Sequence, residues 1–313
     1  GYVFDPRGLS RRRLLRLAAG KDRGELLADL GGRAADPATA LSDIAAHAVS
    51  RPALVDVTAD ETTPLLVAGL EHGFDLVLAN KKPLAGSEAH YRRLLDTADA
   101  TGRRLLYEAT VGAGLPVIDT FRKLVASGDR ILRVDGCVSG TLGYVLSAVE
   151  EGRAFSEVVR DAVEKGYAEP DPRDDLLGRD AGRKGLILAR LLGYHGAGPT
   201  PDPLVPASFA RLPLDAFFKK LPSLDDDWRK RVEKEAARGR VLRYVVRATA
   251  RGVSAHLKSV PRDSYFGVLR DTRNRLAFTT RRYKNEPLAV GGPGAGAEVT
   301  AAGILNDIQS LGV

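Results

Sequence analysis

The feature that most constrains the fold is an alternation of short apolar runs with helical patterns in the first third of the chain. The apolar runs cover residues 53–57, 74–79 and 104–107. Between them, residues 62–72 and 87–100 carry apolar side chains at helical spacing, and Thr62 and Ser87 stand where N-caps are expected. This alternation predicts parallel strands joined by helices, as in a doubly wound α/β sheet.

Polar residues follow each apolar run. Thr58 comes after the first run, Asn80 and Lys81 after the second, and Glu108 after the third. Because the carboxyl ends of parallel strands line one edge of a sheet, where ligands bind, these residues together predict a site. Each of them alone is weak support, since strand ends are generally polar.

After Gly112 the pattern changes to a mixture of helices and strands. We predict helices from about Leu115 and at 142–150, 156–165 and 173–192, with strands at 131–138, 241–249, 254–260 and 276–283. Residues 199–206 read as a loop. A last helix at 297–311 is placed to return to the first domain, and the second region is therefore α+β.

The densest cluster of charged side chains lies at residues 166–184. It contains several carboxylates, followed by Arg183 and Lys184, and its prolines keep the first part extended. Asp180 and Lys184, four residues apart, would share one helix face. Charge and spacing alone favour a solvated acidic loop with an ordinary helix salt bridge. The alternative is a site in which carboxylates hold a cationic amine and Lys184 acts as an acid/base, with Lys81 as a second cation.

Two glycine-rich segments could contact ligands. In 108–118, Gly112 and Gly114 permit a turn whose exposed carbonyl oxygens suit a hard cation, although the residues alone favour a tight strand-to-helix connection. Residues 291–303 precede a predicted helix and offer backbone amides to an anion, or form a plain glycine-rich cap. This segment lacks the following strand and the acidic residue of a Rossmann fingerprint.

Composition excludes several classes of function. The 313 residues carry a formal net charge of +7, which is compatible with an anionic partner such as nucleic acid, but aromatic residues make up only 6%. With no nucleic-acid-binding motif present, we expect a solvated basic surface and no nucleic-acid partner. No apolar run approaches the ~20 residues of a membrane span. Cys137 is the only cysteine, which fits a reducing compartment and predicts a cytoplasmic protein.

Five segments, in this order, closely resemble the homoserine dehydrogenase family. They are ANKKP at 79–83, YEATVGAGLP at 107–116, SGTLGYVL at 139–146, GYAEPDPRDDL at 166–176 and GPGAGAEVTAAG at 292–303. The fourth segment and the Arg183–Lys184 pair after it are highly specific. The resemblance implies reversible, NAD- or NADP-dependent interconversion of homoserine and aspartate 4-semialdehyde, a step toward threonine and methionine.

The resemblance also assigns expected roles to residues. Lys184 would be the general acid/base, Asp180 would hydrogen-bond the reacting oxygen or the lysine, and Lys81 would face the nicotinamide and the substrate. The substrate amine would be bound by Glu169 with Asp174 or Asp175. The cofactor cleft would be lined by Thr58, Ala59, Lys81, Gly166 and Gly296. A monovalent cation, sodium or potassium, would be bound by Glu108, Val111, Ala113 and Leu115, mainly through main-chain oxygens.

The same resemblance implies the domain organisation. We expect an incomplete Rossmann-like nucleotide-binding domain at 1–115, completed by 292–313, and an α+β substrate and dimerisation domain at 116–291. The family's opening strand and GxGxxG turn are missing from the sequence, and the chain has no methionine. We therefore expect an N-terminally incomplete chain, with a homodimer or higher homo-oligomer as the assembly. The segment 223–245 and the terminal residues favour the dehydrogenase part of a fusion with aspartate kinase, located in plastids if the source is a plant.

Two other functions stay open at this point. One is a different amino-acid or semialdehyde dehydrogenase on a similar scaffold, and the other is a non-catalytic regulatory binding protein, which the missing nucleotide turn makes conceivable. The set of Glu169, Asp180 and Lys184 argues against the second. Nothing in the sequence separates NAD from NADP, because Arg11, Arg12 and Arg13 suit a 2′-phosphate no better than they suit an exposed helix turn.

Overall fold

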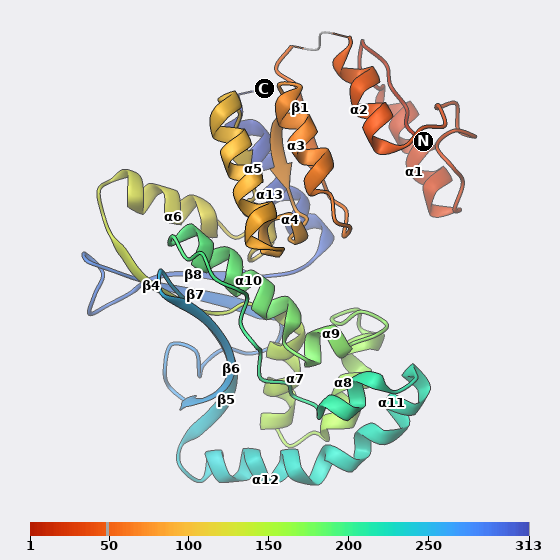
Figure 1. The fold of residues 1–313 in the computed structure, drawn as a ribbon. Coiled ribbons are helices and arrows are strands. Elements are labelled where there is room, and N and C mark those ends of the chain that lie inside the picture. Colours follow the sequence, from red (N-terminus) through yellow and green to blue (C-terminus); the bar gives the residue numbers. More distant parts are fainter. Residues whose placement is uncertain (48–49, 313) are drawn as a thin grey trace.

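The computed structural model describes residues 1–47 and 50–312 and contains two sheets (Figure 1). The first is a three-stranded parallel sheet of order β1-β2-β3. Its strands are β1 (Ala53–Asp56), β2 (Asp75–Leu78) and β3 (Leu105–Leu106). The predicted parallel strands and the α/β fold class are thus confirmed.

Helices cover both faces of the parallel sheet. On one side lie α3 (Thr63–Glu71) and α5 (Glu88–Thr101), and the short α4 (Lys82–Ala85) connects β2 to α5. Ser87 caps α5 as predicted, by accepting the N–H of His90. The opposite face, at Val77 and Leu106, packs against Ile304, Ile308 and Leu311 at the C-terminus. The predicted return of the last helix, α13 (Ala297–Ser310), is therefore confirmed.

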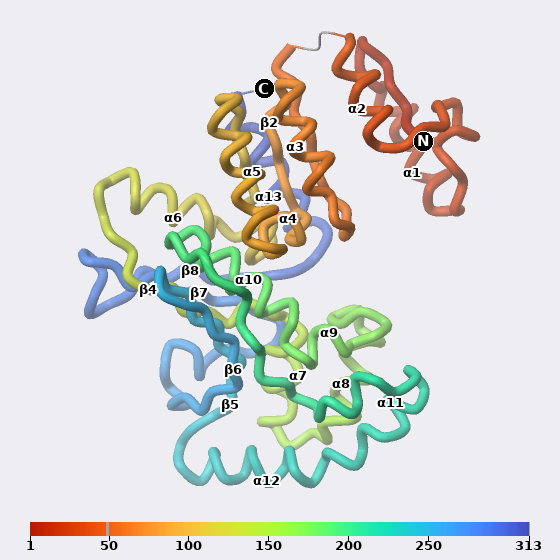
Figure 2. Tube along the Cα trace, viewed as in Figure 1, coloured from red at the N-terminus to blue at the C-terminus, as the bar shows by residue number. Residues whose placement is uncertain are grey.

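The N-terminal segment forms two helices, α1 (Arg11–Asp22) and α2 (Pro37–Ala45). They lie on the side of the parallel sheet, away from the second, five-stranded sheet (Figure 2). Each begins with a side-chain cap. Ser10 accepts the N–H of Arg13, and Asp36 accepts the N–H of Thr39.

The second sheet has five strands in the order β6-β5-β4-β7-β8, and all its neighbours are antiparallel. The strands are β4 (Ile131–Cys137), β5 (Arg240–Thr249), β6 (Gly252–Pro261), β7 (Arg273–Thr280) and β8 (Leu288–Pro293). The helices of this region are α6 (Val117–Ala126), α7 (Gly140–Glu150), α8 (Phe155–Glu164), α9 (Arg173–Leu176), α10 (Arg179–Leu191), α11 (Leu214–Lys220) and α12 (Asp225–Ala236).

Three local predictions need correction. The single helix expected at 173–192 is broken into α9 and α10 by Gly178, which adopts a left-handed conformation with φ 70°. A Cβ at this position would lie 2.0 Å from the hydroxyl oxygen of Tyr244, so only glycine fits. The last predicted strand ends at Thr280 rather than at Tyr283, and β8 was not predicted because its glycines resemble a turn.

The chain passes between the two sheet regions twice. It leaves the parallel sheet after Tyr107, through a 3₁₀ turn at Glu108–Thr110, and returns between β8 and α13. The first passage touches the beginning of α13, where the second passage ends, because a Cβ on Gly114 would lie 2.3 Å from the main-chain oxygen of Val299. Among the described residues, no helix is both long and apolar enough to cross a membrane.

Candidate active site

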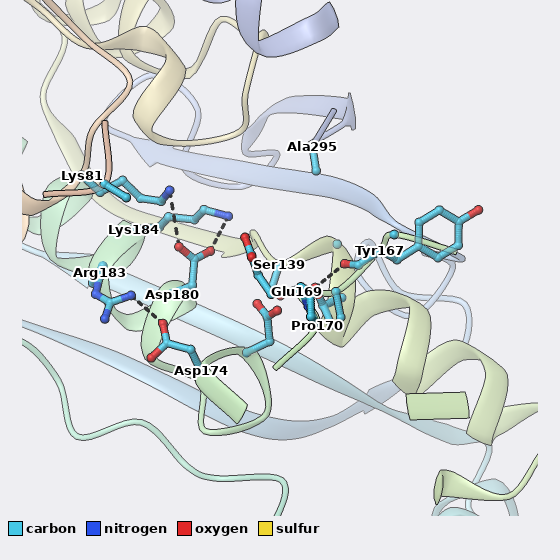
Figure 3. A pocket seen from close by; sticks show the side chains of 16 residues that line it. Lys81, Ser139, Tyr167, Glu169, Pro170, Asp174, Asp180, Arg183, Lys184 and Ala295 are labelled. Atoms are coloured by element: carbon cyan, nitrogen blue, oxygen red, sulfur yellow. Dashed lines mark hydrogen bonds and ion pairs between the residues drawn. The ribbon is translucent and has the colours of Figure 1, made fainter. Parts of the chain in front are cut away.

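A cavity of about 650 Å³ lies between the two sheet regions (Figure 3). The carboxyl ends of β1 and β2 contribute Ala59 and Lys81, as the strand order predicts. The remaining wall comes from the start of α7, from the loop before α9, from α9 and α10, and from Ala295. Its lining residues there are Ser139, Gly140, Thr141, Gly166, Tyr167, Ala168, Glu169, Pro170, Asp174, Asp175, Asp180, Arg183, Lys184 and Ala295.

One carboxylate at the centre of this wall is shared by two lysines. Lys184 Nζ lies 2.8 Å from Asp180 Oδ2, and Lys81 Nζ lies 3.5 Å from Asp180 Oδ1. Lys184 also donates a hydrogen bond of 2.8 Å to the main-chain oxygen of Val138. The predicted helix-face pair is therefore present, and Lys81 joins it from the other sheet region.

The charges of this cluster stabilise one another. Burial favours the neutral form of Asp180, but the ammonium groups of Lys184 and Lys81 outweigh it and hold the pKa of this carboxyl well below its usual value. Asp180 is consequently ionised at every pH at which the protein would work. The Lys184 side chain is 12% exposed and lines the cavity, so an ammonium N–H that bonds neither Asp180 nor Val138 is available to a ligand there.

The two neighbouring aspartates differ in their partners. Asp174 Oδ2 lies 2.7 Å from Arg183 Nη1, and Asp174 Oδ1 lies 3.5 Å from Arg179 Nη1. Asp175 forms no ion pair with any described residue. Burial and the negative charge of Asp180 raise the pKa of Asp175 to about 6. A cationic ligand group would relieve this unfavourable charge, and Asp175 is therefore better placed than Asp174 to bind an amine.

A buried network shapes the two loops that reach the cavity from the parallel sheet. Asp56 accepts hydrogen bonds from the amide and hydroxyl of Thr58, from the Thr62 hydroxyl and from Asn80 Nδ2. Although burial opposes ionisation, these donors lower the pKa of Asp56. Asn80 also accepts the N–H of Lys82 through Oδ1, so the network fixes the turn that carries Lys81.

The side chain of Glu108, a predicted cation ligand, forms hydrogen bonds within the protein. Its carboxylate accepts the amides of Val117, Ile118 and Asp119 at 2.7 to 2.8 Å and so caps the N-terminus of α6. A cation at this turn would have to be bound by main-chain oxygens, as predicted. Ala113 has a φ of 56°, and a Cβ at Gly303 would lie 2.8 Å from its oxygen, so α13 packs tightly on this turn.

Most predicted substrate and cofactor residues line the cavity, with two exceptions. The Thr58 hydroxyl turns back to Asp56, and Gly296 is the N-cap of α13 with its neighbour Ala295 at the wall. Sequence reasoning missed Ser139, Gly140 and Thr141 at the start of α7. The SGTLGYVL segment was recognised as similar to the family, but without the fold nothing placed its first residues against the acidic cluster.

Known proteins resemble the chain over most of its length. A family model described as "Homoserine dehydrogenase" matches residues 116–309, and one described as "Homoserine dehydrogenase, NAD binding domain" matches residues 10–108. The chloroplastic bifunctional aspartokinase/homoserine dehydrogenase 2 of Zea mays is 46% identical over 272 residues, which cover 85% of this chain and 30% of the maize protein. The chain thus spans less than a third of that relative's length.

A second relative carries the same family name, and a solved structure shares the fold of this chain. The homoserine dehydrogenase of Paracoccidioides brasiliensis is 39% identical over 279 residues, which cover 83% of this chain and 74% of that protein. A crystal structure of a Candida auris protein of unknown function superposes with a TM-score of 0.82 at 37% identity. That superposition covers 90% of this chain and 81% of the other.

Proposed function

Since this chain belongs to the homoserine dehydrogenase family, we propose that it interconverts L-homoserine and L-aspartate 4-semialdehyde with NAD or NADP. The observation that carries the proposal is the Asp180 carboxylate held between Lys184 and Lys81 at the wall of the cavity. This arrangement supplies a proton donor beside a second positive charge, and the reaction needs both where negative charge develops on oxygen.

Lys184 acts as the general acid when the aldehyde is reduced. Its ammonium group donates a proton to the aldehyde oxygen, and in the reverse direction the neutral amine accepts the proton of the substrate hydroxyl. Asp180 and the Val138 carbonyl fix two of its three hydrogen-bonding directions, which leaves the third for the reacting oxygen. Lys81 stabilises negative charge on that oxygen.

Asp175 and Glu169 bind the substrate's ammonium group. Asp175 has no cationic partner among the described residues, whereas Asp174 is already neutralised by Arg183. Glu169 lies at the wall of the same cavity. Of Asp174 and Asp175, between which the sequence does not choose, we therefore propose Asp175 as the partner of Glu169.

The nicotinamide cofactor would be held at the edge of the parallel sheet. The residues that fit this role are Ala59, Lys81, Gly166 and Ala295 at the wall, with Thr58 and Gly296 directly behind it. The chemistry that the cofactor supplies is the donation or acceptance of a hydride at the substrate carbon. The amide and hydroxyl of Thr58 both donate to Asp56, and these hydrogen bonds fix the turn after β1 that places Ala59 at the cavity.

We further propose the domain division of 1–115 with 292–313 against 116–291, a homo-oligomeric assembly, and a cytoplasmic or plastid location. A sodium or potassium ion would be bound by main-chain oxygens of Glu108, Val111, Ala113 and Leu115. The left-handed Ala113 supports this, because such a conformation in a non-glycine residue is costly and needs a local reason.

The test is a spectrophotometric assay of the full-length protein with L-homoserine and either NAD or NADP. We expect absorbance at the wavelength of the reduced cofactor to rise with homoserine and much more slowly with L-threonine, L-serine or a homologue with one more methylene. Equal rates with these amino alcohols would indicate a different dehydrogenase, and no reduction by any of them would contradict the proposal.

A further inference from the structure

The catalytic helix contains a buried arginine that contacts the other sheet region. Arg190 lies near the C-terminal end of α10 and is 5% exposed. Its Nη1 donates a hydrogen bond to the main-chain oxygen of Leu84, and its Nη2 donates one of 2.8 Å to that of Gly86. The guanidinium carbon lies 4.6 Å from the centre of the Tyr91 ring on α5.

These contacts serve a specific purpose at the end of α4. The last carbonyl groups of a helix have no partner within the helix, and the planar guanidinium can bind two of them at once. Burying a cation is costly unless it is paired or hydrogen-bonded. The side chain of Arg190 nevertheless reaches from one sheet region to the other. There it binds oxygens at the C-terminal end of α4, a helix of only four residues.

The position of α4 connects this contact to the active site. Lys82, the first residue of α4, directly follows Lys81, whose ammonium contacts Asp180 on α10. α10 therefore binds the Lys81–Gly86 segment at two places, through Asp180 near its start and Arg190 near its end. At ~1.5 Å rise per residue these two places are about 15 Å apart along the helix, so together they fix orientation as well as distance.

We propose that Arg190 is a positioning residue, which orients the parallel-sheet region so that Lys81 and the cofactor edge face Lys184. The inference rests on the proposed function, in which the cofactor is bound by one sheet region and the substrate by the other. Hydride transfer requires close alignment of donor and acceptor, and an error of ~1 Å can lower the rate on the order of 100-fold. Arg190 acts on this alignment without touching either reactant.

The kinetic test compares Arg190→Lys and Arg190→Met with Arg243→Lys. Arg243 is the control because it is an equally buried arginine, 2% exposed, whose partners all lie within one sheet region. It donates to the main-chain oxygens of Leu242, Gly267 and Leu269 and pairs with the Glu150 carboxylate. We expect kcat of Arg190→Met to fall on the order of 10- to 100-fold, with the KM for homoserine little changed. Arg190→Lys should retain an intermediate kcat, because an ammonium can reach one of the two carbonyls.

The isotope effect separates positioning from stability. With homoserine deuterated at the carbon that is oxidised, the primary isotope effect on kcat should rise in the Arg190 variants, because misalignment makes hydride transfer limiting. Arg243→Lys should lose thermal stability without this rise. An unchanged kcat and isotope effect in folded Arg190→Lys, or an equal change in Arg243→Lys, would overturn the proposal.

A second readout does not depend on activity. Hydrogen exchange should become faster for the amides of residues 81–87 in Arg190→Lys, whereas Arg243→Lys should affect the region around Gly267 and Leu269. If the wild type fails to oxidise homoserine, the proposed function is wrong, and the exchange result still decides whether Arg190 holds α4. Unchanged exchange at residues 81–87 would contradict that link.

Discussion

Lys81 Nζ and Asp180 Oδ1 lie 3.5 Å apart, which joins the end of a parallel strand to a helix that packs on the antiparallel sheet. The proposed active site therefore draws its charged groups from both regions and needs them in contact. Lys184 occupies the other oxygen of the same carboxylate, so the three charged groups form one unit.

Replacing Lys184 by alanine removes the proposed proton donor. We expect kcat to fall on the order of 10²- to 10⁴-fold, the usual contribution of a positioned acid/base. Circular dichroism and the melting temperature should show an intact fold. Lys123→Ala is the control, because Lys123 pairs with Asp119 on the exposed surface of α6. Wild-type turnover in Lys184→Ala would exclude this role.

Asp175→Asn and Asp174→Asn should differ in substrate affinity. We expect the KM for homoserine to rise roughly 10- to 100-fold in Asp175→Asn, because this variant loses a charge-assisted hydrogen bond to the substrate. The rise should be clearly smaller in Asp174→Asn, because the Asp174 carboxylate is already paired with Arg183. Because the pKa of Asp175 is raised to about 6, the wild-type KM should increase as the pH falls through about 6. The reverse order of the two variants would show that Asp174 binds the amine.

The same pKa predicts how Asp175 affects stability. Between the ordinary value of 3.8 and about 6, the folded protein binds a proton at Asp175 that the unfolded chain has lost. The contribution of this residue to the free energy of unfolding therefore decreases as the pH rises through this window. Urea titrations at pH 4 and pH 7 should show a smaller decrease for Asp175→Asn than for the wild type. An identical decrease in the two proteins would mean that the pKa of Asp175 is not raised and that its carboxyl lies in a more polar environment than the structure indicates.

Glu108→Ala removes the cap of α6. We expect a loss of roughly 2–3 kcal/mol in the free energy of unfolding, because three amides lose a charged acceptor. The urea midpoint measures this loss. Glu164→Ala, at an exposed position in α8, should stay within about 0.5 kcal/mol of the wild type. If both variants were equally stable, the capping role of Glu108 would be refuted.

Gly178→Ala tests the break between α9 and α10. Both Gly178 and Gly193 have left-handed backbones, with φ of 70° and 88°. A Cβ at Gly178 would also clash with the hydroxyl of Tyr244, whereas a Cβ at Gly193 would have nothing within 4 Å. Gly193→Ala should cost about 1–2 kcal/mol from backbone strain alone. Gly178→Ala should cost roughly 1–3 kcal/mol more from overpacking. Equal melting temperatures of the two variants would mean that the contact with Tyr244 relaxes freely.

The sequence predicts those parts of the fold that depend on neighbouring residues. Apolar periodicity located β1, β2 and the cap of α5 at Ser87, and the spacing of Asp180 and Lys184 placed them on one helix face. Gly178 was overlooked because a single glycine inside an apolar helical pattern is usually tolerated, and Tyr244, which leaves no room for a side chain there, lies on the distant strand β5.

Contacts between distant segments could not be predicted in this way. The pairing of Asp56 with Asn80 and of Arg190 with Leu84 depends on how the strands and helices come together. In the sequence, nothing distinguishes Arg190 from the many other arginines of the chain. Likewise, the preference for Asp175 over Asp174 follows from the position of Arg183 one helix later, and the two adjacent aspartates are equivalent until that helix is placed.

The passage after β3 lies against the first turns of α13 at Gly114 and Val299, and again at Ala113 and Gly303, with no side chain between them. The two covalent connections between the sheet regions are therefore adjacent. Sliding of one region past the other would stretch both connections, whereas a change in the angle between the regions would not. The contacts Lys81–Asp180 and Arg190–Leu84, which oppose such a change, are made by side chains rather than by the chain itself. Substitution of a few side chains would thus alter this angle and leave the backbone contacts at Gly114 and Gly303 in place.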